Sequence, residues 1–206
     1  MNVYTYFEPL NLNDAKELIP LWVGAWKRVG CTPVVLLPAD AVQADDYREF
    51  VARVSSYPTV NPPAYELACY VRWLALREAM GWQTGPTALM VDLDVVPRSA
   101  LPPASVLHDV VFHDPARVPC AVEATLSGAE QIVNFLSKLP PYVSQHDGRP
   151  HTSDMVCLQQ APWPATGFCR EYGSTGWETS PLVHFASCKM QGRRKSEVVR
   201  EFVSSL

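Results

Sequence analysis

Short apolar runs alternate with amphipathic segments along this chain, and that order restricts the fold more than any other feature. Strands are predicted for the apolar, β-branched runs at residues 2–7, 32–40, 87–96, 109–114 and 119–125. Helices are predicted, from apolar side chains at three- and four-residue spacing, for residues 14–29, 45–54, 64–81 and 128–139, and for a last segment from about Ser196. This alternation is typical of an α/β fold with three layers, α/β/α, around a mostly parallel sheet.

Composition limits the class of protein. The chain has 206 residues, of which 48% are hydrophobic and 18% are charged, so one sizeable core in one domain is expected. A formal net charge of −4 argues against a generally basic nucleic-acid-binding protein, although it leaves room for a local basic patch. The 6 cysteines form no C-x-x-C pair, which argues against a structural zinc site.

The chain shows no positively charged leader before an apolar region, and no apolar run near the roughly 18 residues that a transmembrane helix needs. From the sequence we therefore expect a protein of the cytoplasm, without a transmembrane segment.

Two aspartates, Asp92 and Asp94, follow the apolar run Ala-Leu-Met-Val at residues 88–91. Ligands of parallel α/β sheets bind at the carboxyl ends of the strands, so this motif lies at the edge where a site is expected. We expect the two carboxylates to point to opposite faces, so that one can reach a metal while the other orients water, a sugar or a second metal position. A short D-x-D also occurs as a strand end with solvated or capping aspartates.

Three further features strengthen the prediction of a ligand site. Arg72 lies in a mostly apolar helix and needs an anionic partner, either a ligand or an aspartate of the chain. His184 follows another apolar stretch and is either a core histidine or a metal ligand. A cationic cluster that suits a diphosphate, and equally suits a solvated face, follows at Lys189, Arg193, Arg194 and Lys195.

Five segments carry a family resemblance: VYTYFEP from residue 3, LWVGAWKRVGCTPVVLL from residue 21, YELACYVRWLAL from residue 65, MVDLDVVP from residue 90 and LVHF from residue 182. Together they resemble glycosyltransferases of the GT-A fold, which are nucleotide-diphospho-sugar transferases. The sequence looks most like the bacterial and phage-type group related to capsular polysaccharide synthesis proteins and mannosyl-type transferases. The resemblance implies a single domain over residues 1–206, with a nucleotide-sugar-binding half at 1–100 and an acceptor-side half at 101–206.

The resemblance implies where a nucleotide sugar would bind. Arg72, in the helix before the D-x-D, would help to hold it. The end of the first strand would bind the nucleobase, at Tyr4, Thr5, Tyr6 or Phe7.

The resemblance also implies a metal site for Mn²⁺ or Mg²⁺. Asp92 and Asp94 would bind the ion, Asp92 would also contact the sugar nucleotide, and His184 would complete the metal shell. Lys189 would contact the diphosphate. The chain departs from the family pattern at Cys69, where many relatives carry an aspartate three residues before the helix arginine, and the sugar contact expected from that aspartate is in doubt.

The implied activity is transfer of a sugar from a nucleoside diphosphate sugar, with a UDP-sugar favoured, to an acceptor hydroxyl. An inverting enzyme would need a carboxylate base, for which the candidates are Asp154, otherwise a helix cap or turn residue, and Glu123, otherwise structural. The acceptor could be a glycan or a modified base in DNA, and the acidic pI counts against the base. Donor sugar, stereochemical outcome and oligomeric state stay open.

Two other functions fit parts of the sequence. One is a degenerate GT-A domain that binds a nucleotide without turnover, which Cys69 keeps open. The other is a phosphatase of the haloacid-dehalogenase type, because ALMVDLDVV also fits that family's nucleophile strand. That fold normally begins with this strand and needs a later lysine and a later acidic pair. Here the strand begins only at about residue 87 and no comparable acidic pair follows, which argues against a phosphatase.

Overall fold

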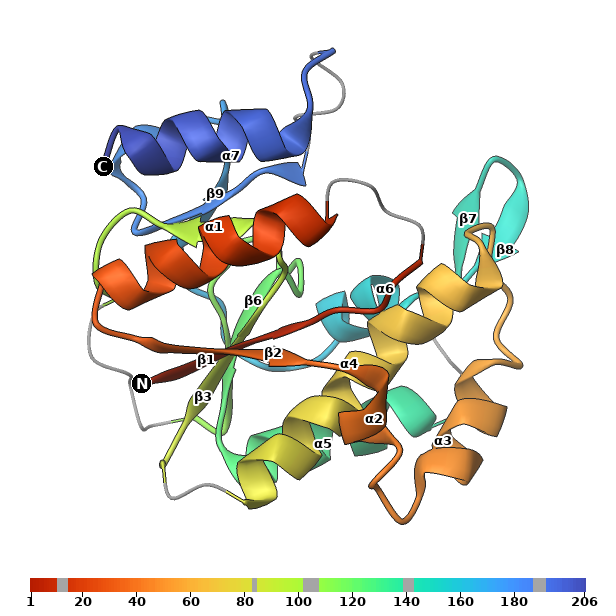
Figure 1. Cartoon of the computed structure of the whole chain (residues 1–206). Coiled ribbons are helices and arrows are strands. Elements are labelled where there is room, and N and C mark those ends of the chain that lie inside the picture. Colours follow the sequence, from red (N-terminus) through yellow and green to blue (C-terminus); the bar gives the residue numbers. More distant parts are fainter. Residues whose placement is uncertain (11–14, 83–84, 102–107, 139–142, 187–191) are drawn as a thin grey trace.

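A five-stranded sheet lies at the centre of the computed structural model, which describes residues 1–10, 15–82, 85–101, 108–138, 143–186 and 192–206 (Figure 1). Its strands, in the order β2-β1-β3-β6-β5, are β1 Asn2–Tyr6, β2 Thr32–Leu36, β3 Ala88–Val91, β5 Val110–Phe112 and β6 Ala121–Ala124. β1 pairs in parallel with β2 and β3, whereas β6 is antiparallel to both β3 and β5. β6 is thus the reversed strand, and the prediction of a mostly parallel α/β sheet is confirmed.

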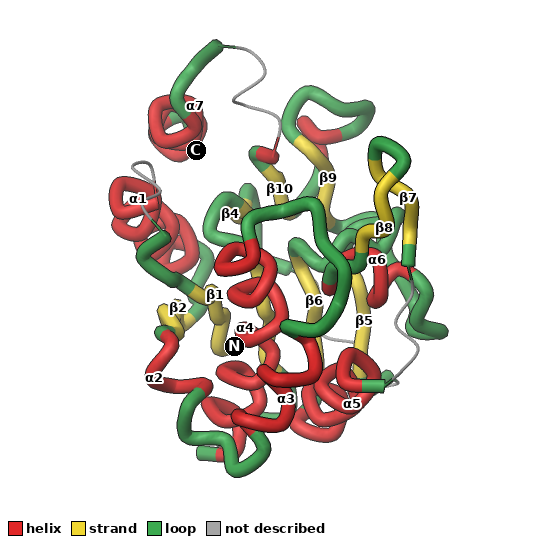
Figure 2. The backbone as a smooth tube through the Cα atoms, turned by 90° about the vertical axis from the view of Figure 1, so that its right-hand side faces the viewer, coloured by secondary structure: helices red, strands yellow, loops and turns green. Residues whose placement is uncertain are grey.

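Helices cover both faces of this sheet and give three layers (Figures 1 and 2). On one face lies α1, Ala15–Arg28, which packs against α7, Lys195–Ser204. On the other face lie α4, Pro63–Gly81, and α5, Leu126–Ser137, with the short helices α2, Pro38–Ala41, and α3, Tyr47–Val54, outside α4. Alternation along β1 divides the core, because Val3 packs toward Trp22 and Trp26 of α1 while Tyr4 packs on the α4 side.

The run at 87–96, predicted as one strand, is two strands in two sheets. β3 ends at Val91, a turn follows in which the Val95 N–H donates to the Asp92 carbonyl over 2.9 Å, and β4, Val95–Pro97, begins. β4 joins a second sheet with β9, Cys169–Glu171, and β10, Leu182–His184. The D-x-D therefore lies in a turn between two sheets, not in an extended strand. The expectation of two carboxylates on opposite faces of a strand is wrong, because side chains two positions apart on a strand share a face.

Several predicted elements also differ from the structure at their ends. The run at 32–40 stops at Leu36, because Pro38 starts α2. α5 starts at Leu126, two residues before the predicted start, because the Thr125 hydroxyl caps it by accepting from the Gly128 N–H over 3.0 Å. The remaining elements are β7 Ser144–His146, β8 Arg149–His151, α6 Asp154–Gln159 and a 3₁₀ turn at Trp177–Thr179. Among the helices of the described ranges, none has the length and apolarity to cross a membrane.

Gly128 sits where α5 meets the chain entering β5. A Cβ at this residue would lie 1.9 Å from the Asp109 carbonyl oxygen, which belongs to backbone and cannot turn away. We expect Gly128→Ala to lower the free energy of unfolding by about 3 kcal/mol, measured by urea denaturation. Gly24→Ala is the matched control in α1, where a Cβ meets nothing within 4 Å, and it should raise stability by up to about 1 kcal/mol. Equal effects of the two substitutions would contradict this packing.

Candidate active site

A cavity of about 430 Å³ lies at the carboxyl ends of β1 and β3, the edge where a parallel α/β sheet binds its ligands. Segments far apart in the sequence line it: Thr5–Phe7 at the end of β1, Tyr65, Cys69 and Arg72 of α4, Asp92–Asp94 after β3, Asp154 of α6 and Lys195 of α7. Both halves of the chain, 1–100 and 101–206, contribute to its wall. The division into a donor half and an acceptor half stays a prediction.

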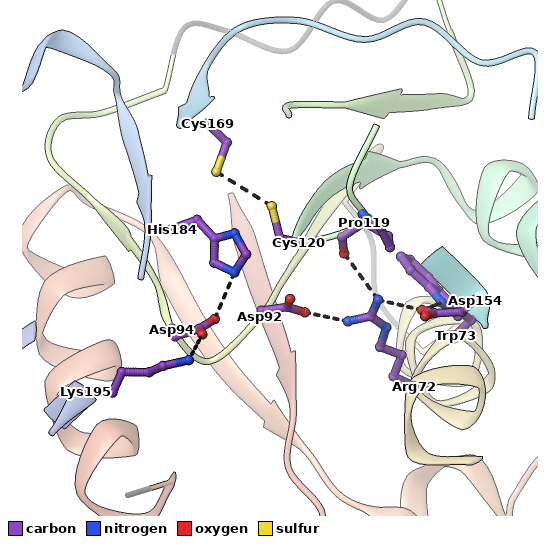
Figure 3. Close-up of polar contacts among 10 residues, drawn as sticks. All are labelled: Arg72, Trp73, Asp92, Asp94, Pro119, Cys120, Asp154, Cys169, His184 and Lys195. Atoms are coloured by element: carbon purple, nitrogen blue, oxygen red, sulfur yellow. Dashed lines mark hydrogen bonds and ion pairs between the residues drawn. The ribbon is translucent and has the colours of Figure 1, made fainter. Parts of the chain in front are cut away.

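Asp92, Asp94 and His184 form a cluster in which one ligand atom from each lies within 4.8 Å of the others. The two aspartates come from the turn after β3. His184 ends β10, whose antiparallel register pairs it with Val95, the residue after Asp94, and so brings its Nε2 to 3.5 Å from Asp94 Oδ1 (Figure 3). The structure thus brings together all the residues predicted as metal ligands.

Two carboxylates and one imidazole suit Mn²⁺ or Mg²⁺, because these ions prefer oxygen ligands and manganese also accepts nitrogen. The donor set therefore fits the ion that the sequence resemblance implies.

Lys195, the first residue of α7, donates from Nζ to Asp94 Oδ2 (Figure 3). Its side chain is 16% exposed and that of Asp94 is 14% exposed, so the pair is largely shielded from solvent. Lys189, which we predicted as the diphosphate contact, lies outside the described residues. Within the part of the chain that is described, Lys195 is the member of the cationic cluster that lines the cavity.

These contacts shift the ionisation of the cluster. Burial acts to raise the pKa of Asp94, but His184 and Lys195 outweigh it and hold that pKa well below its usual range. Burial acts to lower the pKa of His184, but the Asp94 carboxylate and the Cys120 thiol raise it to about 11. Burial raises the pKa of Asp92, against the opposing charge of Arg72.

Arg72 is the buried cation at the centre of the other half of the site. It is 9% exposed and donates from Nη1 to Asp92 Oδ1 over 2.5 Å and from Nη2 to Asp154 Oδ2 over 2.6 Å. Nη2 also reaches the Pro119 carbonyl at 3.3 Å, and Trp73 Nε1 donates to Asp154 Oδ2 over 3.1 Å. The anionic partner that the sequence required for Arg72 is therefore a pair of aspartates of the chain, and Arg72 fixes the orientation of Asp92.

The four residues predicted to bind the nucleobase do not all lie at the cavity. Thr5, Tyr6 and Phe7 line the cavity. Tyr4 is 1% exposed in the core on the α4 side of the sheet and does not line it. The Tyr6 hydroxyl donates to Glu8 Oε2 over 3.2 Å.

The two candidate bases are also separated. Asp154, which is 3% exposed, lines the cavity, and it begins α6 directly after the cap Ser153. Glu123 is not among the lining residues described. It lies on β6, 8% exposed, with Oε2 3.4 Å from His113 Nε2.

Sequence reasoning did not single out Tyr65, which lines the cavity one turn before Cys69 and two turns before Arg72. These residues are spaced by four and then three positions, which places them on one face of α4. That spacing, read backward from Arg72, was a signal that could have found it.

The fold is shared with solved glycosyltransferases, although no family model and no curated protein sequence matches the chain. A galactosyltransferase, LgtC, solved with donor and acceptor sugar analogues, superimposes with a TM-score of 0.57 at 15% identity, over 100% of this chain and 96% of that one. A glycosyltransferase involved in glycosylation of the major capsid of PBCV-1 gives 0.58 at 8% identity, over 97% and 98%. The chain has a GT-A-type glycosyltransferase fold.

Mouse xyloside xylosyltransferase 1, in its apo form, is also similar, with a TM-score of 0.53 at 8% identity over 90% of this chain and 98% of that one. These matches span nearly the whole length of both chains, so the GT-A fold accounts for both halves of the sequence. The fold predicted from the sequence resemblance is confirmed.

Arg72→Met tests whether the buried guanidinium holds this half of the site. The substitution leaves Asp154 as an uncompensated buried charge, so we expect the free energy of unfolding at neutral pH to fall by about 3–5 kcal/mol. Urea denaturation measures it, and Arg72→Met combined with Asp154→Asn should recover part of the loss.

Arg77→Met is the matched control on the same helix. The main partner of Arg77, Asp46, has a side chain that is 45% exposed, and its loss should cost about 1 kcal/mol or less. If Arg72→Met costs no more than this control, the assigned role of Arg72 is wrong.

Proposed function

We propose that this protein is a metal-dependent glycosyltransferase that moves a sugar from a nucleoside diphosphate sugar to an acceptor hydroxyl. The observation that carries the proposal is the Asp92, Asp94 and His184 cluster, whose two aspartates line the cavity at the carboxyl ends of β1 and β3. The GT-A-type fold supports it, because all three solved structures compared above are glycosyltransferases by name. Because one fold can carry many different activities, the metal cluster and not the fold is the basis of this proposal.

Asp92, Asp94 and His184 would hold Mn²⁺ or Mg²⁺. When bound, such an ion supplies positive charge that stabilises the charge developing on a leaving diphosphate. Arg72 keeps one Asp92 oxygen in place through its 2.5 Å hydrogen bond, so the carboxylate is oriented before any ligand arrives.

The donor nucleotide would lie along the part of the cavity wall that is formed by the end of β1 and the residue after it. Tyr6 and Phe7 present aromatic rings there, on which a nucleobase can stack. A UDP-sugar is the donor that we propose first. The transferred sugar would then extend from the metal cluster toward Arg72 and Asp154, which line the same cavity.

Asp154 is the base candidate that lies at the cavity. Arg72 and Trp73 of α4 both donate to its Oδ2, and these two hydrogen bonds fix the orientation of the carboxylate. Glu123 is not proposed for this role, because it lies on β6 beside His113. We propose a glycan as the acceptor and keep a modified base in DNA as the second class to test.

Release of nucleoside diphosphate tests the proposal. Incubation with Mn²⁺ and a panel of UDP-, GDP- and ADP-sugars should give metal-dependent release from one donor. Asp92→Asn and Asp94→Asn should each reduce the rate by about 100-fold or more, because each removes a carboxylate ligand of the cation that stabilises the leaving diphosphate. Asp147→Asn is the control, since the Asp147 side chain is 82% exposed and its positive φ of 51 is tolerated by Asn.

Two other results would contradict the enzyme proposal. If no nucleotide sugar binds and none releases nucleoside diphosphate, the proposed nucleotide-sugar function is excluded. The protein would instead be a binding module of GT-A type if it bound a donor in a metal-dependent way but neither released nucleoside diphosphate nor transferred the sugar to a glycan acceptor or to modified DNA.

A further inference from the structure

The ligand atoms of the metal cluster already face cationic partners within the chain. Arg72 Nη1 donates to Asp92 Oδ1, and Lys195 Nζ donates to Asp94 Oδ2. His184 Nε2 lies 3.5 Å from Asp94 Oδ1. A divalent cation that binds Asp94 therefore competes with the Lys195 ammonium for the charge of one carboxylate. The competitor thus belongs to the protein itself.

The two cations that face the aspartates differ in how firmly they are held. Arg72 has three oxygen acceptors, on Asp92, Asp154 and Pro119, and is packed over the Trp73 ring at 4.8 Å. For Lys195, the described contacts give a single acceptor, Asp94 Oδ2. Lys195 is thus the one of these two that a ligand can move.

The backbone that carries Lys195 is anchored. Val198, Val199 and Phe202 of α7 are buried against α1 and β10, and Arg194 pairs with Glu17 of α1 at 2.6 Å. A lysine ammonium on its flexible four-carbon stem can therefore swing without displacement of the helix. A diphosphate in the same cavity would offer it an anionic acceptor of higher charge than one carboxylate.

We propose that Lys195 is an internal counter-cation that occupies Asp94 in the free protein and moves to the diphosphate when a nucleotide binds, which makes metal and nucleotide bind cooperatively. The inference rests on the proposed function and adds a regulation of its site. Without nucleotide, the metal competes with Lys195 and binds weakly. With nucleotide, Asp94 is released to the metal while the ammonium stays in the cavity as a second positive charge.

Thermodynamic linkage makes this coupling reciprocal. If the nucleotide raises the affinity for the metal by some factor, the metal raises the affinity for the nucleotide by the same factor. Couplings of this kind are about 5- to 150-fold. Replacement of Lys195 by a neutral side chain should remove the competitor and the part of the coupling that Lys195 contributes.

Mn²⁺ binding followed by electron paramagnetic resonance tests this without any turnover. Wild-type protein, Lys195→Met and the control Lys16→Met, an exposed lysine of α1, are titrated with Mn²⁺ alone and then with Mn²⁺ in saturating UDP, GDP or ADP. We expect Lys195→Met to bind Mn²⁺ alone about 10-fold more tightly than the wild type, and the nucleotide to tighten Mn²⁺ binding by a smaller factor than in the wild type. Lys195→Arg should keep the coupling, and Lys195→Gln replaces the methionine variant if that variant does not fold.

The outcomes separate the two proposals. If the wild type binds no Mn²⁺ even with a nucleoside diphosphate, the metal-dependent function itself fails. If the wild type binds Mn²⁺ but Lys195→Met binds it with equal or lower affinity in the absence of nucleotide, the function stands and the role of Lys195 is overturned.

Discussion

The buried guanidinium of Arg72 is the interaction on which this site depends. Removing a charged group from water costs several kcal/mol, and Arg72 offsets that cost only because two aspartates and a carbonyl converge on it. Those partners come from the turn after β3, from α6 and from the segment before β6. The ion-pair network therefore fixes three separate elements against α4, and it orients Asp92 as a consequence.

The turn at Asp92–Asp94 is the junction between two sheets, and this junction explains why the chemistry gathers there. β3 delivers the chain to the ligand-binding edge of the central sheet, and β4 then carries it into the sheet that holds His184. One carboxylate faces the Arg72 side and the other faces His184 and Lys195 (Figure 3). The cavity is thus lined by a cationic group on each side of a pair of acidic ligands.

The fold and half of the site follow from local patterns, and the rest depends on contacts that local patterns do not contain. Alternating strands and helices predicted the layers, and the D-x-D at a strand end predicted the metal cluster. The sequence resemblance predicted His184 as a metal ligand, and the antiparallel register of β10 on β4 explains how it reaches Asp94 from about ninety positions away. Placing Lys195 at the cavity required the start of α7, and placing Glu123 beside His113 required the pairing of β6 inside the sheet.

In the proposed function, Asp92, Asp94 and His184 together hold a divalent cation against a nucleoside diphosphate. Anomalous diffraction at the manganese edge, from crystals of the protein grown with Mn²⁺ and UDP, tests this most directly. We expect one strong peak in contact with all three side chains, with the diphosphate on its open side. A peak at another place, or none in crystals where UDP is bound, would contradict it.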